Sequence, residues 1–391
     1  MMNPEHRAMF RFLISGLILL IVLAGWGFWS RFGTKPPQTL RQLQQSSLLR
    51  QLRPPAASLD RAASPLVPLY LDRRFDDIVR AASSKSSNDA VTAKLLPLEE
   101  ILIGNSLALL GRWRDAEVYY EMVSPGPYRA DARADLSLAF SALKDPNRGI
   151  EAAVEALEAD QKRGDLAAQA GDLGTLGTFA FVLGDFAKAM GAHKAALNLA
   201  MEAGDPWREA MERTSLGNFL YIQHHFDSAL DYQRGALRLY QSSGDPIGEA
   251  HALTSLGLIH KEKGNREDAL RFFAEAQELY RRIGDREEES RTWINLALIQ
   301  QDREDYDAAL RAARTALTIE EHGSGPLGVA VALGTVGTIQ KSAGDYPGAI
   351  KTFEEALDLF KKAGAEQQIH GVEIEIKSLK DRVSASSTAP H

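Results

Sequence analysis

One spacing constrains this chain more than any other feature. The same residue types return at an interval of about 40 residues, within the range typical of stacked repeats, over about half of the chain. Alanine recurs at two positions of the period, and leucine, replaced once by valine, recurs at a third. These positions are Ala189, Ala229, Ala269, Ala309 and Ala349; Ala196, Ala236, Ala276, Ala316 and Ala356; and Leu176, Leu216, Leu256, Leu296 and Val336. The spacing therefore predicts a solenoid, which offers a long binding surface rather than a deep catalytic pocket.

Each period predicts a pair of antiparallel helices. Within residues 206–245, apolar and small residues form two stripes with helical spacing. Most copies carry glycine and an acidic or amide residue between the stripes, as at Gly184-Asp185, and again between repeats, as at Gly204-Asp205. Glycine suits the position that follows a helix, and aspartate suits the N-cap of the next one. One copy has His224-His225 at the turn instead.

The pattern resembles the tetratricopeptide repeat family. The family's Leu-Gly on the first helix, and its alanine, aromatic and alanine on the second, are matched by Leu256, Gly257, Ala269, Phe273 and Ala276. The family's usual repeat is shorter than the period of this chain, at about 34 residues. The longer form looks like the variety found in kinesin light chains and spindle-positioning adaptors. The resemblance covers residues 166–365. It implies an all-α fold, a right-handed superhelical solenoid of antiparallel helix pairs. From the apolar run described below, we expect one transmembrane helix to precede the solenoid.

The sequence divides into seven segments on this interpretation. They are a short N-terminal tail (1–11), a transmembrane anchor (12–30), a basic Pro-rich linker (31–67), degenerate repeats (68–165), five regular repeats (166–365), a capping helix (366–383) and a disordered tail (384–391).

The predicted anchor is an apolar run near the N-terminus. Residues 12–29 carry no charge and lie between Arg11 and Arg31. At 1.5 Å per residue such a helix is about 27 Å long, close to the hydrocarbon thickness of a bilayer. We therefore expect a single-pass protein of a bacterial inner (cell) membrane. The alternative is a signal peptide cleaved after Val22-Leu23-Ala24. Positive charges flank both ends almost equally, which leaves the side of the repeats undecided.

The linker allows two interpretations. Leucines recur with helical spacing at Leu40, Leu43, Leu48 and Leu52, with arginines alongside. A basic amphipathic helix on anionic lipid would show this pattern. We favour the second interpretation, a short solvated linker helix, because the stretch is brief and bounded by prolines.

Charge and composition exclude several classes of function. The net charge is −7, and residues 66–391 alone carry −13, which argues against a nucleic-acid partner. The chain has no cysteine, so disulfides and thiolate catalysis are excluded. Gly323, Gly325 and Gly328 match a dinucleotide-binding spacing but lie at an inter-repeat turn. We expect no cofactor, no metal and no catalytic residues.

The resemblance to tetratricopeptide repeats implies a partner-binding groove on the concave side, lined by the first helix of each repeat. By register, its candidate residues are Asn218, Tyr221, His251, Thr254, Lys261, Arg291, Asn295, Gln301 and Lys341. Some members of the family hold a C-terminal carboxylate with lysine and asparagine on successive first helices. Only Asn218 fits that pattern, so we expect this carboxylate clamp to be absent.

The sequence thus predicts a membrane-anchored scaffold that binds a partner protein or peptide in the groove, and not an enzyme. Two alternatives stay open. One is a peptide-sensing regulator, and the other is an accessory subunit of an envelope assembly or secretion complex.

Overall fold

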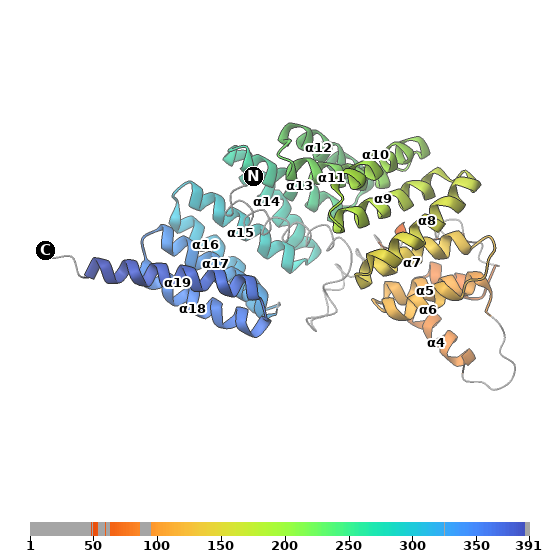
Figure 1. Ribbon diagram of the computed structural model, residues 1–391, viewed down its shortest axis with the longest axis horizontal. Helices are drawn as coiled ribbons and strands as arrows, with labels where there is room; N and C mark the ends of the chain where they lie inside the picture. Colours follow the sequence, from red (N-terminus) through yellow and green to blue (C-terminus); the bar gives the residue numbers. More distant parts are fainter. Residues whose placement is uncertain are drawn as a thin grey trace. The chain divides into compact units, whose positions relative to one another are not determined.

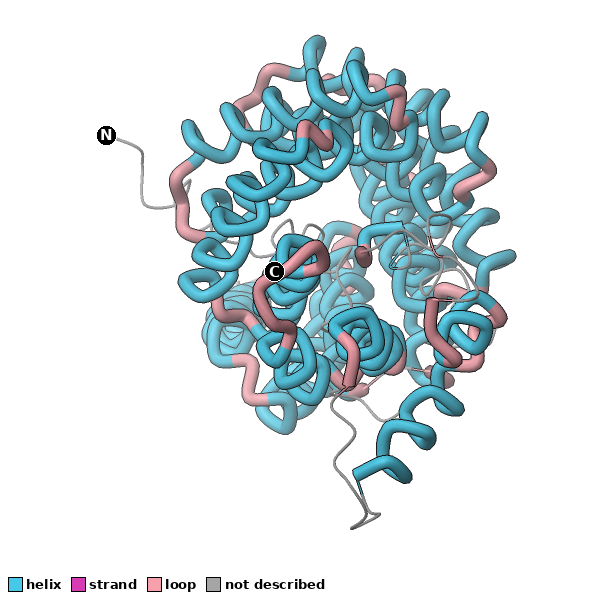
Figure 2. Tube along the Cα trace, turned by 90° about the vertical axis from the view of Figure 1, so that its right-hand side faces the viewer, coloured by secondary structure: helices cyan, strands magenta, loops and turns pink. Residues whose placement is uncertain are grey.

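The computed structural model describes residues 48, 50–53, 59, 63–86, 95–323 and 325–387. All regular secondary structure in these ranges is α-helical, and short turns join the helices (Figures 1 and 2). The helices form two compact units. The N-terminal unit ends at Phe219 and the C-terminal unit begins at Leu220, within one helix.

The helices of the N-terminal unit are α3 (Leu66–Leu71), α4 (Phe75–Ser86), α5 (Pro97–Leu109), α6 (Trp113–Met122), α7 (Arg129–Leu143), α8 (Pro146–Arg163), α9 (Leu166–Val182) and α10 (Phe186–Ala203). Helix α11 (Pro206–Ile222) contains the division. The helices of the C-terminal unit are α12 (Phe226–Ser243), α13 (Pro246–Glu262), α14 (Arg266–Ile283), α15 (Arg286–Asp302), α16 (Tyr306–Glu321), α17 (Pro326–Ser342), α18 (Tyr346–Ala363) and α19 (Glu366–Ser387).

Consecutive helices pack as pairs, and the pairs stack. The most extensive contacts join α9 with α10, α13 with α14, α15 with α16, and α17 with α18. Second helices also contact the first helix of the following pair, as α8 does with α9 and α14 with α15. The predicted all-α solenoid of packed helix pairs is confirmed. Its right-handed superhelical sense over the whole chain stays a prediction.

The turns between helices have the predicted chemistry. Glycines with positive φ follow the helices at Gly164, Gly184, Gly204, Gly244, Gly264, Gly284, Gly344 and Gly364. At the next position, an aspartate such as Asp185 or Asp345 caps the following helix by accepting a hydrogen bond from its backbone N–H. The αL conformation at the glycine ends one helix, and the cap starts the next at a fixed place.

Small residues on one helix make room for large ones on its neighbour. The ten alanines that recur with the period are fully buried. A Cβ placed on Gly257 would lie 2.7 Å from Cε1 of Phe273, and one on Gly337 would lie 2.9 Å from a ring atom of Phe353. These distances are shorter than a van der Waals contact. Glycine is therefore required for the two helices of a pair to approach this closely.

Helix α19 covers the last pair. Its Ile376 and Leu379 are buried against Ala349 and Phe353, while its other face is exposed. The helix continues to Ser387, past the predicted end at 383. At the other end of the chain, the predicted anchor (12–30) lies outside the described residues. No helix in the described ranges is long and apolar enough to span a bilayer.

The α11–α12 turn combines two features that sister turns show singly, which leads to a prediction about stability. Glu304 is also a non-glycine residue with positive φ, and Asn265 is also an N-cap without a side-chain hydrogen bond. His224 has φ 60°, and His225 occupies the N-cap without a side-chain hydrogen bond. A non-glycine residue in αL costs about 1 kcal/mol, and an aspartate cap contributes about 1 kcal/mol. Replacing the pair by His224→Gly with His225→Asp also removes the edge-to-face contact of His224 with Phe226, which offsets part of this gain. We expect a net stabilisation of about 1 kcal/mol, seen as a higher urea midpoint with unchanged slope.

The reverse change in a sister turn is the control. Gly264→His with Asn265→His should lower the midpoint, because Gly264 also has a positive φ of 77°. No change in either variant would contradict this account of the turns.

Candidate functional site

The first helices of the pairs line one face within each unit. Helix α7 contacts both α5 and α9 in the N-terminal unit, and α15 contacts α17 in the C-terminal unit. In the described part of the chain, no two successive second helices approach each other to the same extent. A stack whose members are closer on one side is curved toward that side. We call the face formed by the first helices the inner face.

The inner face of the N-terminal unit is occupied by a short piece of the predicted linker, residues 48 and 50–53, which we call the linker segment. Its Leu48 and Leu52 belong to the core of this unit, beside Tyr70 and Leu136. Both leucines are almost fully buried. The structure thus differs from the expected solvated linker helix over these residues, because their apolar side chains pack against the first helices.

Both polar main-chain groups of Arg53 form hydrogen bonds with side chains of the solenoid. Its N–H donates to both carboxylate oxygens of Asp135 on α7, at 2.9 and 3.1 Å. Its carbonyl accepts from Nδ2 of Asn105 on α5, at 2.9 Å. The Asn105 side chain is oriented in turn, because the Tyr120 hydroxyl donates to its Oδ1 at 2.8 Å. Two first helices therefore bind the backbone of one residue.

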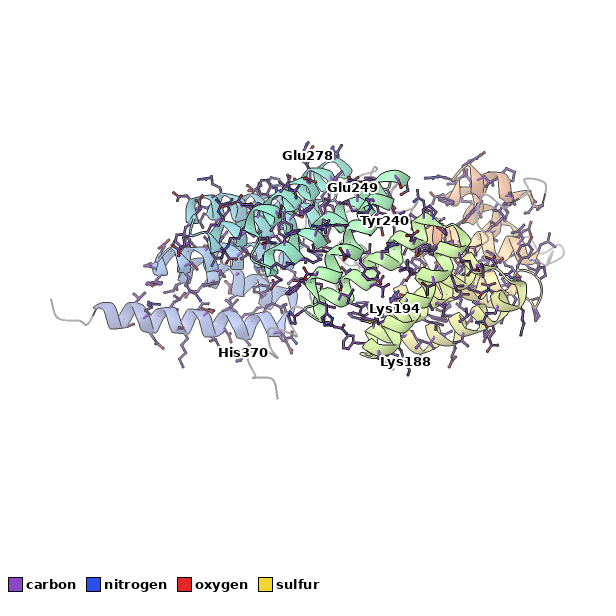
Figure 3. The ribbon with its side chains drawn as sticks, turned by 90° about the horizontal axis from the view of Figure 1, so that it is seen from above. Lys188, Lys194, Tyr240, Glu249, Glu278 and His370 are labelled. Carbon is purple, nitrogen blue, oxygen red and sulfur yellow. The ribbon has the colours of Figure 1, made fainter. Side chains whose placement is uncertain are left out.

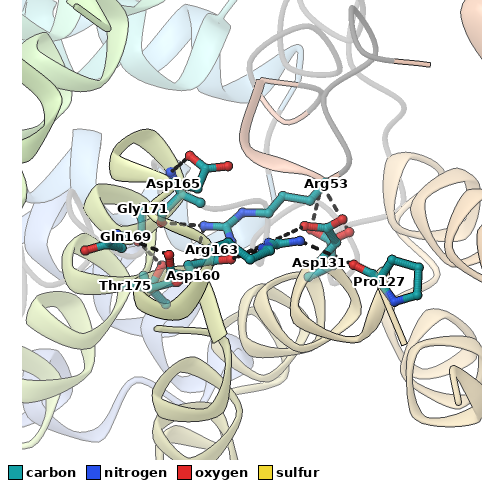
Figure 4. A network of polar contacts seen from close by, with 12 residues as sticks. Arg53, Pro127, Asp131, Asp160, Arg163, Asp165, Gln169, Gly171 and Thr175 are labelled. Atoms are coloured by element: carbon teal, nitrogen blue, oxygen red, sulfur yellow. Dashed lines mark hydrogen bonds and ion pairs between the residues drawn. The ribbon is translucent and has the colours of Figure 1, made fainter. Parts of the chain in front are cut away.

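The Arg53 side chain enters an acidic cluster (Figure 4). Its guanidinium donates to Asp160 at the end of α8, to Asp172 on α9 at 2.9 Å, and to the carbonyl of Ala168 at 2.6 Å. Only 7% of Arg53 is exposed. We call the set of Asn105, Asp135, Asp160, Asp172 and the Ala168 carbonyl the arginine site.

A second arginine closes the cluster from the side of α8. Arg163 pairs with Asp160 and, at 3.1 Å, with Asp131 on α7, and it donates to the carbonyl of Pro127 (Figure 4). Asp160 therefore bridges Arg53 and Arg163. Removing either arginine would leave a carboxylate in a poorly hydrated place, which is costly.

The charges of the arginine site are strongly coupled. Burial alone would lower the pKa of Arg53, but four surrounding carboxylates outweigh it and raise that pKa above its ordinary value. Burial raises the pKa of Asp172 to about 7 and that of Asp135 well above its ordinary range. The pKa of Arg208 on α11 is lowered by burial and by the charge of Arg53. Burial thus favours the protonated form of these carboxyl groups, and the Arg53 guanidinium opposes it by stabilising their ionised form.

Comparison with known proteins identifies the repeats. A family model described as tetratricopeptide repeat matches residues 207–282, 248–322 and 288–362. Residues 207–362 belong to the tetratricopeptide repeat family. No curated protein sequence matches the chain.

Solved structures resemble the chain in fold at low identity. The tetratricopeptide sensor-containing signal transduction ATPase with numerous domains from Pyrococcus horikoshii matches with a TM-score of 0.63 at 13% identity, over 86% of this chain and 55% of that one. The apo form of RapI matches with 0.57 at 12%, over 87% and 98%. A Rap protein complexed with competence and sporulation factor matches with 0.55 at 11%, over 88% and 99%. These similarities show the fold alone.

The groove residues predicted from the tetratricopeptide register are half-buried, except Thr254, which is buried. Thr254 donates to the Ala250 carbonyl, and His251 contacts the Tyr280 hydroxyl at 3.1 Å. Burial lowers the pKa of His251 and raises that of Tyr221. The side chains of Asn218, Lys261 and Asn295 are half-buried. Thr254 and His251 therefore meet at Tyr280 inside the C-terminal unit.

Three other predicted residues form ion pairs or hydrogen bonds along the inner face. Arg291 pairs with Glu287 and Glu288 on its own helix. Gln301 on α15 donates to Ser342 of α17 at 2.8 Å, and Lys341 on α17 pairs with Glu375 of α19 at 2.8 Å. The last two contacts tie successive inner-face helices together. The assignment of all nine residues to partner binding stays a prediction.

The arginine site was not predicted from the sequence, although the repeat register indicates where two of its aspartates lie. Asp131 and Asp135 lie four repeat periods before Arg291 and Asn295, which were predicted to line the groove. Extending the tetratricopeptide register upstream would have placed both aspartates on the inner face. Nothing local marks Arg53, because its partners are 52 to 119 positions away in sequence.

The bridging role of Asp160 leads to a testable prediction. Asp160→Asn removes the charge shared by Arg53 and Arg163, and we expect it to lower the free energy of unfolding by about 3 kcal/mol. Urea unfolding followed by circular dichroism measures this change. Glu158→Gln, an exposed site on the same helix, is the matched control and should leave the midpoint unchanged. A loss as small as that of the control would show that the cluster is hydrated and contributes little.

Proposed function

We propose that this chain is a scaffold that binds a partner protein or peptide along the inner face of its repeats, and that it acts by binding and not by catalysis. One observation carries the proposal. The inner face of the N-terminal unit already holds residue 53 through main-chain hydrogen bonds and a buried arginine. The same face of the C-terminal unit is formed by first helices of the same register.

The binding mechanism follows from the rigidity of the helix pairs. Polar groups on the inner face are held in place before a partner arrives, so the ordering cost falls on the partner's segment. Asparagine and aspartate side chains bind the main chain of that segment, whatever its sequence. Charged pairs such as Arg291 with Glu288 supply groups that can exchange partners, which gives specificity.

The membrane attachment is part of the same proposal. The uncharged run at positions 12–29 has the length of a membrane-spanning helix. An anchor there would hold the repeats at the surface of a bacterial inner membrane. Partner binding would then recruit that partner to the membrane.

A peptide-sensing regulator is the second candidate. Its support is the Rap protein complexed with competence and sporulation factor, which shares the fold of this chain at 11% identity. The occupied inner face of the N-terminal unit adds to that support, because a site that can be vacated can also be regulated. In this form of the proposal, the partner segment is itself the signal.

Photocrosslinking in cells tests the location of the partner surface. A photoreactive amino acid at Asn295 or Lys261 lies on first helices, whereas one at Glu278 on α14 or Lys194 on α10 lies on exposed parts of second helices (Figure 3). We expect the same discrete crosslinked protein from both inner-face positions and none from the outer ones. Equal crosslinking from the second helices would contradict the proposed surface.

Membrane fractionation tests the anchor. We expect the full chain to stay in the membrane fraction through alkaline carbonate extraction, and a chain lacking residues 12–30 to be released. An N-terminus that begins after Ala24 in the mature protein would show that the segment is cleaved. The chain has no cysteine, so Ser387→Cys creates a unique thiol. Labelling this thiol with an impermeant maleimide before or after lysis reports the side of the repeats.

A further inference from the structure

We propose that the arginine site is a ligand site for an arginine-bearing segment of a partner protein, and that Arg53 occupies it as a tethered ligand that such a segment displaces. This inference rests on the proposed function, whose partner chemistry it specifies. It differs from the predicted groove in place and in chemistry, because its residues lie on α5, α7, α8 and α9 of the N-terminal unit.

The first argument is the way the main chain of Arg53 is bound. Both its N–H and its carbonyl are bonded to side chains of the solenoid, Asp135 and Asn105, and no backbone group of the described residues bonds to either. Helices and turns satisfy their backbone groups among themselves. Side chains that bind both polar groups of one residue are the arrangement expected for a peptide ligand, since any other residue's main chain could make the same two bonds.

The second argument is the selectivity of the side-chain pocket. Asp160, Asp172 and the Ala168 carbonyl surround one guanidinium and accept hydrogen bonds from its two terminal nitrogens. A planar guanidinium donates in several fixed directions, whereas a lysine ammonium is a single point charge. The site therefore selects arginine over lysine. Buried Leu52 adds a preference for an apolar residue immediately before the arginine.

The third argument is the effect of Arg53 on the charge of the cluster. Four aspartates, at 131, 135, 160 and 172, act on Arg53, and Arg163 and Arg208 are the other cations that contact or influence them. The guanidinium of Arg53 favours the ionised form of Asp131, Asp135 and Asp172, whose pKa values burial raises, so without it these carboxyl groups would take up protons. An empty site is thus a poor resting state, and exchange of one arginine for another preserves the balance.

The fourth argument is that Arg53 does not saturate the site. The Asp172 side chain is only 2% exposed, and its Oδ2 accepts no hydrogen bond from an N–H group in the described part of the chain. Its carboxyl neighbour is Asp160, with which it can bond only when one of the two carboxyl groups is protonated. A buried carboxylate oxygen without a donor is unfavourable. A partner segment that places an additional N–H or O–H there would make a bond that the tethered segment does not make.

Tethering sets a threshold for exchange. A ligand that belongs to the same chain as its site has an effective concentration there on the order of 1 mM. A free segment with the same contacts therefore competes only at comparable concentration. A partner exceeds this threshold by making further contacts along the inner face, so that weak or partial matches are excluded.

Peptide binding to the full chain in detergent micelles is the first test. The probe is a fluorescein-labelled peptide with the sequence of residues 46–55, followed by fluorescence anisotropy. We expect it to bind the Arg53→Ala chain at least tenfold more tightly than the unmodified chain, because the tethered competitor is weakened. The peptide with alanine at position 53 should not bind the Arg53→Ala chain. The peptide with lysine at that position should bind this chain at least tenfold more weakly than the arginine peptide does. Adding Asp160→Asn to the Arg53→Ala chain should abolish binding.

A second measurement covers the case in which Arg53→Ala does not fold. The half-buried Gln51 is replaced by cysteine in an otherwise unchanged chain, and this unique thiol carries an environment-sensitive dye. Millimolar arginine peptide should shift the dye emission toward that of a solvent-exposed dye, and the alanine peptide should not. The absence of a shift would overturn the proposal, and so would the absence of peptide binding to a folded Arg53→Ala chain. Either result would show that the linker segment is a fixed part of the unit.

The peptide-binding test can fail without contradicting the proposed function. Crosslinking at Asn295 and Lys261 reports the C-terminal unit and does not require the arginine site. A partner crosslinked there, with no peptide exchange at Arg53, would leave the scaffold proposal standing and remove this inference alone.

Discussion

The close approach of the two helices in each pair is the constraint on which the rest of the structure depends. Gly257 lies against Phe273, and Gly337 lies against Phe353, at distances that leave no room for a Cβ. The fully buried alanines on the second helices serve the same purpose. Because each pair is thin, the next pair can stack on it and bring the first helices into contact. The inner face exists only because of this repeated packing.

Buried charge has a different role in the N-terminal unit. Asp135 and Asp172 on its first helices, with Asp160 at the end of α8, surround one arginine from outside the repeats. A pair of buried charges rarely adds more stability than apolar residues of the same size would. Such a cluster is better explained by selectivity, because it accepts a guanidinium in one orientation. The C-terminal unit instead pairs Arg291 with acidic residues of its own helix, so those carboxylates are balanced by a cation of the same repeat.

Much of the fold could be predicted, and much of the site could not. The period located the helices of the regular repeats and the turns, including the unusual one at His224, because these features depend on local sequence. The repeat register used to predict the groove also applies to the N-terminal unit. Asp131 and Asp135 lie on the face of α7 that corresponds to the face of α15 carrying Arg291 and Asn295. The linker was misjudged over the linker segment. A short apolar stretch between prolines looks solvated when its distant partners are unknown.

The sequence by itself determined a stack of tetratricopeptide helix pairs, since glycine, alanine and capping aspartates at fixed spacing permit one local geometry. It also determined which residues fall on the first helices. Only the tertiary structure decided that Arg53 enters the acidic cluster and that Asn105 and Asp135 bind its backbone. The physical reason is the separation in sequence between the interacting residues. Helix pairing is fixed by residues within one period, whereas this buried ion-pair cluster needs residues more than 100 positions apart to meet in a place where water is excluded.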